Sequence, residues 1–512
     1  MADKHNPNRD ACPVTVDAVL AEARQQFEKL LQDCQQSDGS FWEFEKYLRG
    51  CLAALACVLV RLFLAARHQR LDLQPYLQTG THRLGDPYAK RRLKTRHGTV
   101  TYGRAHLIPL KGGPGFHPLD AVLGLSRDQF SPGLMELVAR LATRLSYPAT
   151  HLVCRAVLGW SPATEAIEQV VLGLGRHAAP FMQQQAAPPD DGEVLVIEVD
   201  GKCPPTATAE ELRKRRGKRR HRTGCACGCQ RHRGRAKRRA RGSKKRRKKG
   251  DKSKNGKEVV VVVMYTLKQG DDGQLHGPLN KKVWASFAGR PAAAQWARAA
   301  ATRRGFGPET TKTVQIVIDG AKGLKQNLEL LFPKAIFTLD ICHVVEKLWD
   351  LGHRFHAEGS DGLKAWVEES KALVYQGRAA ELVERLRDLL KQVPTHGPGT
   401  KGRRRTLQAL IGYLEPRLNM MRYHEWIAQD LVIASGQVEG AVRHVVGERL
   451  DCAGMRWLQG KAEALLHLRC IELNGDWEAF FAWAHQRYHD QLSQARRVKV
   501  LTDEPLALAE AA

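Results

Sequence analysis

The stretch VLVIEVDG (194–201) decides the fold of this chain, because it joins an apolar run of β-forming residues to an acid and a glycine. A second and longer apolar run, EVVVVVMYTL (258–267), follows it. Continuous runs of this kind are typical of strands that are covered on both faces of a sheet. We therefore expect an α/β domain with a buried central sheet and an acid at the end of its first strand.

Further segments extend this sheet. The sequence predicts strands over 281–288, 312–319 and 335–340, with helices over 291–304 and 323–332. The resulting order, β-β-β-α-β-α-β-α, is that of the ribonuclease-H-like fold, in which the first and fourth strands are neighbours. A long amphipathic helical region follows. The predicted fold class is α/β, with a ribonuclease-H-like mixed sheet that carries an all-helical insertion and follows a mostly helical DNA-binding region.

The N-terminal part is expected to be a helical hairpin, with helices over 14–35 and 41–70. The most apolar run, 51–66, contains Arg61 and is too short to span a bilayer, so a buried helix is expected there. With no signal peptide and mostly single cysteines in apolar stretches, we expect a soluble, intracellular protein in a reducing compartment, with no membrane partner.

A possible DNA-reading element follows the hairpin. Residues 90–118 are basic and rich in β-formers, which predicts a small ribbon. Helices predicted over 148–158 and 162–174 flank a Gly-Trp-Ser turn, as in a helix-turn-helix motif, although any helical hairpin gives this pattern. The expected segments are the N-terminal hairpin (1–89), the DNA-binding region (90–185), the first part of the core (193–343), the helical insertion (344–430), the last part of the core (431–490) and a tail (491–512).

The net charge of +27 is concentrated in one segment of the 512 residues. Residues 213–254 contain 23 Lys and Arg and one acid, a net +22, which leaves +5 for the rest. We expect this insert to be disordered when free and to bind phosphates without reading sequence; the alternative is a solvated loop. The predicted DNA contacts are Arg91, Arg92, Lys94 and Arg96 in the ribbon and Arg215, Arg216, Arg219, Arg238, Lys245 and Arg246 in the insert.

Within the insert, Cys225, Cys227, Cys229 and His232 form a cluster of soft ligands. Such ligands suit Zn²⁺, but alternate cysteines are closer than the usual spacing of zinc sites. Thiols in a basic loop are therefore the favoured interpretation, and a zinc site is the alternative.

Three acids are the predicted catalytic and metal-binding residues. Asp200 and Asp319 end the first and fourth predicted strands, and Glu439 lies in a helix expected to be capped by Ser435. Because those strands are neighbours, the two aspartates are expected to meet, and such close like charges need a cation. Oxygen ligands select Mg²⁺ or Mn²⁺, and a third acid would complete a two-metal site for phosphodiester chemistry. For either aspartate alone, capping of a turn is the alternative.

Two further residues are accessory candidates. Asp340 and His343 are three apart where the fifth strand meets its helix, so both could face one cleft. We expect His343 to contact a phosphate or assist a leaving group rather than to bind metal; the alternative is a helix cap and a packed histidine. For the third acid, Glu448 and Asp451 are alternatives to Glu439.

Several motifs together resemble bacterial insertion-sequence transposases of the ISKra type, DDE enzymes with a ribonuclease-H-like core and Mutator-like relatives. The motifs are IEVDGKCPPTAT (197–208), LNKKVWASF (279–287), IVIDGAKGL (316–324), LDICHVVEKLW (339–349) and SGQVEG…RLDCAGMRW (435–457), and PLDAVLGL (118–125) is similar to the family's N-terminal region. The resemblance implies a catalytic triad of Asp200, Asp319 and Glu439, a helical insertion before the Glu, and transposon-end and target DNA as partners. A homodimer or larger assembly on DNA is expected. A structure-specific Mg²⁺-dependent nuclease and a non-enzymatic nucleic-acid-binding protein are the alternatives.

Overall fold

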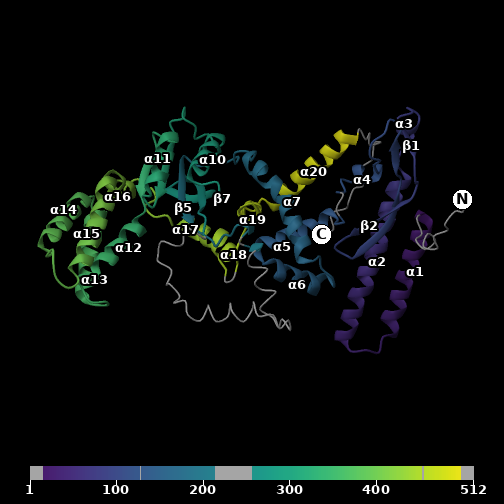
Figure 1. Cartoon of the computed structure of the whole chain (residues 1–512), viewed down its shortest axis with the longest axis horizontal. Helices are drawn as coiled ribbons and strands as arrows, with labels where there is room; N and C mark the ends of the chain where they lie inside the picture. The colour runs from purple at the N-terminus through teal and green to yellow at the C-terminus, as the bar shows by residue number, and fades with distance from the viewer. Residues whose placement is uncertain (1–14, 127–128, 211, 214–255, 453–454, 497–512) are drawn as a thin grey trace, which may run out of the picture. The chain divides into compact units, whose positions relative to one another are not determined.

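The computed structural model describes residues 15–126, 129–210, 212–213, 256–452 and 455–496 (Figure 1). They form two compact units. The first unit extends to Leu174 and also contains the residues from Trp477 onward, whereas the second extends from Gly175 to Asp476. The C-terminal helix α20 (Trp477–Arg496) therefore belongs to the first unit, although the sequence prediction assigned residues up to 490 to the core.

The first unit begins with the predicted helical hairpin. Helices α1 (Val16–Gln36) and α2 (Phe41–Gln69) pack through Val19, Ala23 and Val58. The Ser40 hydroxyl accepts a hydrogen bond from the Glu43 N–H, and the Glu43 carboxylate accepts one from the Ser40 N–H. This reciprocal cap satisfies backbone donors at the start of α2 and fixes where the helix begins.

The predicted basic ribbon is also present, as the antiparallel strands β2 (Ala89–Lys94) and β3 (Thr99–Arg104). Its buried side chains, Leu93 and Val100, pack in one cluster with Leu64 of α2. The remaining short elements before residue 123 are α3 (Gln74–Leu77), β1 (His82–Leu84), β4 (Leu107–Pro109) and α4 (Pro118–Val122).

The helix-turn-helix candidate forms two helices after α5 (Pro132–Arg144). Helix α6 (Tyr147–Leu158) ends at Gly159, which has a φ of 79° that favours glycine, and α7 (Thr164–Gln183) follows. Helix α7 is longer than predicted and continues through Gly175, where a Cβ would lie 2.5 Å from the Ala464 side chain. That close contact gives this helical glycine a structural role.

The second unit is built on a five-stranded mixed sheet with the order β7-β6-β5-β8-β9. Strand β5 pairs antiparallel with β6 and parallel with β8, so the first and fourth predicted strands are neighbours, as expected. The strands are β5 (Val194–Lys202), β6 (Val259–Gln269), β7 (Leu275–Ser286), β8 (Thr313–Ile318) and β9 (Ile336–Leu339), with α10 (Arg290–Arg303) before β8 and α11 (Lys322–Leu331) before β9.

Helices cover both faces of this sheet. The β6 valines 259–263 are buried, as predicted for a strand covered on both sides. Trp284 of β7 stacks on Trp296 of α10, and Glu198 of β5 accepts a hydrogen bond from Val438 in α17 (Gly436–Val442). Val199 is paired with Val262 of β6, and Val262 is paired with Trp284, so the side chains of Val199 and Trp284 lie on one face of the sheet. The neighbouring Glu198 side chain lies on the other face, and α10 and α17 therefore cover opposite faces.

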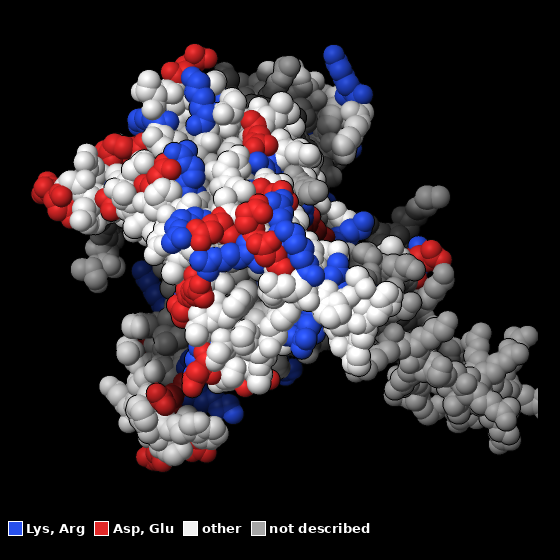
Figure 2. All heavy atoms as spheres, turned by 90° about the vertical axis from the view of Figure 1, so that its left-hand side faces the viewer, with Lys and Arg blue, Asp and Glu red and all other residues white. Residues whose placement is uncertain are grey.

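Between β9 and α17 the chain is helical, as predicted for this segment. It consists of α12 (Ile341–Gly352), α13 (Asp361–Tyr375), α14 (Ala379–Gln392), α15 (Thr400–Leu414), η3 (Glu415–Met420) and α16 (Tyr423–Ile427). Figure 2 shows that basic and acidic side chains are interspersed on the face that it presents. Arg385, for example, pairs with Glu369 and Glu381. This face therefore lacks the single-sign charge that typically attracts DNA.

The chain then returns to the sheet through α17, a π-helical turn (Arg443–Gly447), α18 (Glu448–Leu450) and α19 (Gln459–Leu473). The apolar positions predicted to face the core, such as Val438 and Val445, are buried. The predicted cap is wrong in one respect. Ser435 occupies the N-cap position, but its hydroxyl donates to the Asp340 carboxylate instead of capping α17.

Candidate active site

Asp200 and Asp319 meet at one end of the sheet. The last register pair of β5 and β8 joins Val199 to Ile318, so the two aspartates leave neighbouring parallel strands side by side. Both line a small pocket of about 60 Å³. The meeting of two carboxylates that the strand order predicts is therefore present in the structure.

Each aspartate also stabilises its own turn. Asp200 Oδ1 accepts a hydrogen bond from the Gly201 N–H at 2.6 Å, and Asp319 Oδ1 accepts one from the Ala321 N–H at 2.9 Å. In the described part of the chain, the Oδ2 atom of each has no hydrogen-bond partner. The turn-capping interpretation is thus correct for one oxygen of each carboxylate, and the other oxygen remains available for a ligand.

The electrostatics of this pair favour a cation. Burial raises the pKa of Asp200, and the negative charge of Asp319 raises it further, against the lowering effect of the Gly201 N–H. Two partly buried carboxylates with unbonded oxygens are costly unless a positive charge neutralises them. The donor set consists of oxygens alone, which fits Mg²⁺ or Mn²⁺.

The same pocket contains two charged residues that the sequence prediction missed. Arg290, at the start of α10, donates from Nη2 to Glu258 Oε1 at 2.8 Å and from Nε to Glu258 Oε2 at 3.2 Å. Both line the pocket with the two aspartates. No sequence motif identifies them, because only the fold brings residue 258 and residue 290 beside the strand ends.

Glu439 lies in a second cluster. Its carboxylate, one oxygen of Asp340 and one ring nitrogen of His343 all lie within 4.8 Å of one another. Glu439 is exposed on α17 and does not line the Asp200–Asp319 pocket. The structure therefore brings two members of the predicted triad into one pocket and places the third beside the accessory pair.

The competing candidates for the third acid are already paired. The Glu448 carboxylate accepts a hydrogen bond from Arg469 at 3.1 Å and is hydrogen-bonded to the His444 ring. The Asp451 carboxylate forms an ion pair with Lys202 at 3.2 Å. Glu439 forms no ion pair with any residue that the structure describes, and burial and the charge of Asp340 raise its pKa. Glu439 thus remains the third acid best placed for a ligand.

Asp340 holds this second cluster together. It is fully buried (0% exposed) and accepts four hydrogen bonds. These come from the Cys342 N–H (2.9 Å), His343 Nδ1 (2.6 Å), the Ser435 hydroxyl (2.6 Å) and the Ser435 N–H (3.3 Å). Burial alone would raise the pKa of Asp340, but these bonds lower it overall. The predicted alternative, a helix cap, is therefore part of its role, and its other bonds tie α12 to the start of α17.

The protonation state of His343 bears on what the cluster can bind. The hydrogen bond to Asp340 raises the pKa of His343 to about 9, which keeps the imidazole protonated at neutral pH. A protonated imidazole has no lone pair for a metal. In the metal-free protein His343 is therefore a cationic hydrogen-bond donor, and the geometry of the three residues would also admit an ion if the proton left Nε2.

We expect the His343 imidazole to titrate near pH 9 in metal-free protein, as measured by NMR of its ring protons. Because its folded pKa lies above the ordinary 6.5, the stability it contributes is fully present below that pH and is lost as the pH rises through about 9. Asp340→Asn should lower this pKa. Ser435→Ala, which leaves the Asp340–His343 bond in place, should not. An ordinary His343 pKa in the wild type would contradict the assignment.

A buried carboxylate positions Glu439. Glu198 accepts the Val438 N–H at 2.8 Å and the Tyr265 hydroxyl at 2.7 Å, and burial raises its pKa to about 7. Glu198 lies two residues before Asp200 and on the same face of β5, because side chains alternate along a strand. One strand therefore presents Asp200 directly and anchors the helix that carries Glu439.

The helical insertion positions Asp319. Tyr413 donates its hydroxyl to the Asp319 carbonyl at 2.9 Å, and Arg417 donates to the Gly320 carbonyl from Nε at 3.0 Å and from Nη2 at 2.6 Å. Gly320 has a φ of 79°, and a Cβ there would lie 2.5 Å from Arg417 Nε. The insertion therefore fixes the turn that directly follows β8.

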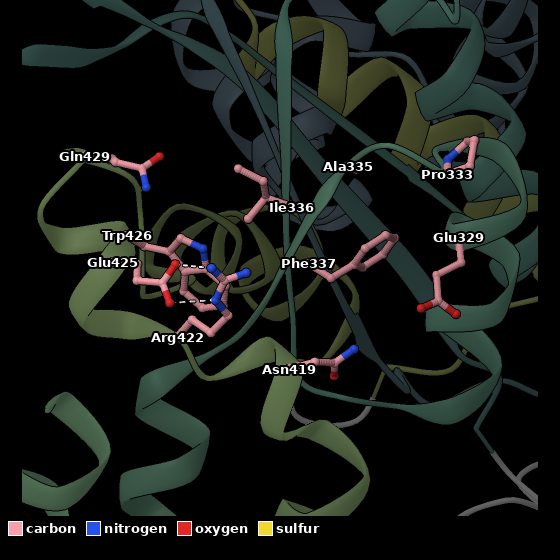
Figure 3. A pocket seen from close by; sticks show the side chains of 10 residues that line it. All are labelled: Glu329, Pro333, Ala335, Ile336, Phe337, Asn419, Arg422, Glu425, Trp426 and Gln429. Atoms are coloured by element: carbon pink, nitrogen blue, oxygen red, sulfur yellow. Dashed lines mark hydrogen bonds and ion pairs between the residues drawn. The ribbon is translucent and has the colours of Figure 1, made fainter. Parts of the chain in front are cut away.

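A much larger pocket, of about 720 Å³, lies elsewhere (Figure 3). It opens beside Ile336 and Phe337 of the edge strand β9, and the Arg422–Glu425 ion pair lines its other side. None of the predicted acids lines it. Pocket size therefore does not indicate the site of chemistry in this chain.

The predicted DNA contacts divide into three groups. Arg92 is exposed on the ribbon, and Lys94 is half-buried over the Phe130 ring. Arg96, in the turn after β2, is exposed but pairs with Glu136 at 2.7 Å and donates to the Gly133 carbonyl. Arg91 is different, because it is buried and paired with Asp120 at 2.9 Å, so its role is structural. The rest lie outside the described residues: Arg215, Arg216, Arg219, Arg238, Lys245, Arg246 and the cluster Cys225, Cys227, Cys229 and His232.

The helix-turn-helix prediction gains no electrostatic support. The first turns of α7 expose Glu165 and Gln169, and its first basic residue is Arg176. DNA reading by α7 therefore stays a prediction.

Comparisons with known proteins leave the family open. Neither the protein-family models nor the curated proteins compared with this chain match it.

Proposed function

We propose that this chain is the DNA transposase of an insertion sequence, which binds transposon ends in the bacterial cytoplasm and catalyses phosphodiester cleavage and strand transfer. The observation that carries the proposal is the pair Asp200 and Asp319 on neighbouring strand ends, each with one oxygen unbonded. The strand order and helical insertion support a ribonuclease-H-like core, and three of the transposase-like motifs contain Asp200, Asp319 and Asp340.

The residues divide the chemistry between them. Asp200 and Asp319, with Glu439, would hold Mg²⁺ or Mn²⁺, which supplies a Lewis acid that activates a water or 3′-hydroxyl and stabilises the leaving oxygen. Protonated His343 binds a phosphate oxygen, and Asp340 keeps the proton on that imidazole. Arg290, held by Glu258, adds a second positive charge beside the aspartate pair. The basic insert and Arg92 and Arg96 supply sequence-independent affinity for DNA.

The test is an in vitro reaction of the full chain with labelled transposon-end DNA and a target plasmid, with Mg²⁺, with Mn²⁺ and with a chelator. We expect joined product only with a divalent ion. Cleavage without joining would favour the nuclease alternative. Metal-independent DNA binding with neither cleavage nor joining would favour a non-enzymatic nucleic-acid-binding protein.

A further inference from the structure

The pocket beside the two aspartates holds more acidic than basic residues. Three acids line it, Asp200, Asp319 and Glu258, and Arg290 is the one basic residue among its lining residues. Two of the acids are the proposed metal ligands. The single guanidinium can pair with Glu258 or approach the aspartates, and this choice bears on whether the aspartates can bind a cation.

Arg290 is held by Glu258. Its Nη2 donates to Glu258 Oε1 at 2.8 Å and its Nε donates to Oε2 at 3.2 Å. Two parallel hydrogen bonds of this kind fix the orientation of a guanidinium as well as its position. The side chains are 33% (Arg290) and 38% (Glu258) exposed, so this contact, and not enclosure by other side chains, determines where the guanidinium lies.

The sheet separates this pair from the aspartates. Glu258 directly precedes β6, in which Val260 is aligned with Gly201 and Val261 with Asp200. Because side chains alternate along a strand, Glu258 lies on the face that α10 covers and Asp200 on the face that α17 covers. A Cβ at Gly201 would lie 3.0 Å from Glu258 Oε1. The glycine that follows Asp200 therefore makes room for the Glu258 carboxylate.

The aspartates attract the same guanidinium. The hydrogen bonds to Glu258 raise the pKa of Arg290, and the charges of Asp319 and Asp200 raise it further. A guanidinium is a permanent cation whose planar fork matches carboxylate oxygens. Without Glu258, Arg290 would pair with the aspartates and compete with a metal ion for their oxygens.

We propose that Glu258 is a positioning residue, which holds Arg290 on the α10 face and thereby keeps the oxygens of Asp200 and Asp319 available for a divalent cation. This inference rests on the proposed function, because that function requires the metal site. It also gives Gly201 a role, since a side chain there would displace Glu258. Neither Glu258 nor Arg290 has to contact the metal.

The test is a double-mutant cycle on the full chain without DNA. The readout is Mn²⁺ affinity, measured from the electron paramagnetic resonance signal of free Mn²⁺, and only binding that Asp200→Asn abolishes is counted. Glu258→Gln keeps the side-chain length, but its amide cannot accept both hydrogen bonds of the guanidinium.

We expect Glu258→Gln to weaken Mn²⁺ binding about tenfold or more, because the released guanidinium then neutralises the aspartates. Arg290→Gln alone should change the affinity less than about threefold, and the double variant should bind within about threefold of wild type. The matched control is Glu425→Gln, which breaks a bidentate Arg–Glu pair beside the larger pocket and should leave Mn²⁺ binding unchanged.

Four results would overturn the inference. Wild-type affinity in Glu258→Gln would show that the aspartates do not capture Arg290. A double variant as weak as Glu258→Gln would make Glu258 a metal ligand. A gain in Arg290→Gln equal to the loss in Glu258→Gln would reduce the pair to two independent charges. A wild-type chain with no Mn²⁺ site that Asp200→Asn removes would instead contradict the proposed function, and this inference with it.

Discussion

Asp200→Asn and Asp319→Asn should each reduce strand transfer by about a thousandfold or more, equivalent to roughly 4 kcal/mol of transition-state stabilisation. Asparagine keeps the shape and the turn hydrogen bond of each side chain but removes the charge that a divalent cation needs. The measurement is the initial rate of joined product with labelled end DNA, compared with wild type at equal protein concentration.

The thermal stability of the same two variants provides a second, independent test of the metal site. Because the two carboxylates repel each other, losing one charge should leave the thermal midpoint of metal-free protein unchanged or raise it. Mg²⁺ should raise the wild-type midpoint and have little effect on the variants, since a ligand stabilises only the state that binds it. Asp271→Asn, at an exposed turn between β6 and β7, is the matched control. Wild-type strand transfer by Asp200→Asn would refute the catalytic assignment.

Arg417→Ala should lower the free energy of unfolding by roughly 3 kcal/mol and strongly reduce strand transfer. The Arg417 side chain is buried and donates to the carbonyls of Gly320 and Tyr413, so its loss leaves buried acceptors unsatisfied. The turn after Asp319 would then lose its support from the helical insertion. Denaturant unfolding measures the first effect, and the rate of joining at a temperature where the variant is folded measures the second.

The control is Arg405→Ala, an exposed arginine in the neighbouring helix α15, which should behave as wild type in both measurements. If Arg417→Ala lost stability but joined DNA at the wild-type rate, the insertion would be a structural support alone, with no role in placing Asp319.

Local patterns predicted the frame of the core. The apolar runs that became β5, β6 and β8 are long enough to identify buried strands without any tertiary information, and their order predicted which strand ends meet. In the ribbon, composition alone could not separate structural from exposed basic residues. The four predicted DNA contacts between residues 91 and 100 looked equivalent in the sequence. Strand alternation separates them: Arg91 shares a face with buried Leu93, and Arg92 points the other way.

The contacts that complete the site were not predictable in the same way. Serine is a common helix-capping residue, so the sequence predicts that Ser435 caps α17. Its hydroxyl instead donates to Asp340, which the fold brings close from another part of the chain. Arg290 and Glu258 acquire their position from the sheet and not from any local motif. Helix α20 was assigned to the core because its sequence does not indicate which of the two units it packs against.

The anchoring of α17 by β5 has a consequence for the order of events during synthesis. Glu198 and Val438 are 240 residues apart in the chain, with the whole helical insertion between them. Contacts between such distant residues form late, because a long loop must close first. A ribosome-bound chain that has exposed Asp200 and Asp319 still lacks Glu439 and the helix α17 that Glu198 anchors. If the proposed function is correct, the nascent chain could therefore not cleave DNA until most of its sequence has been translated.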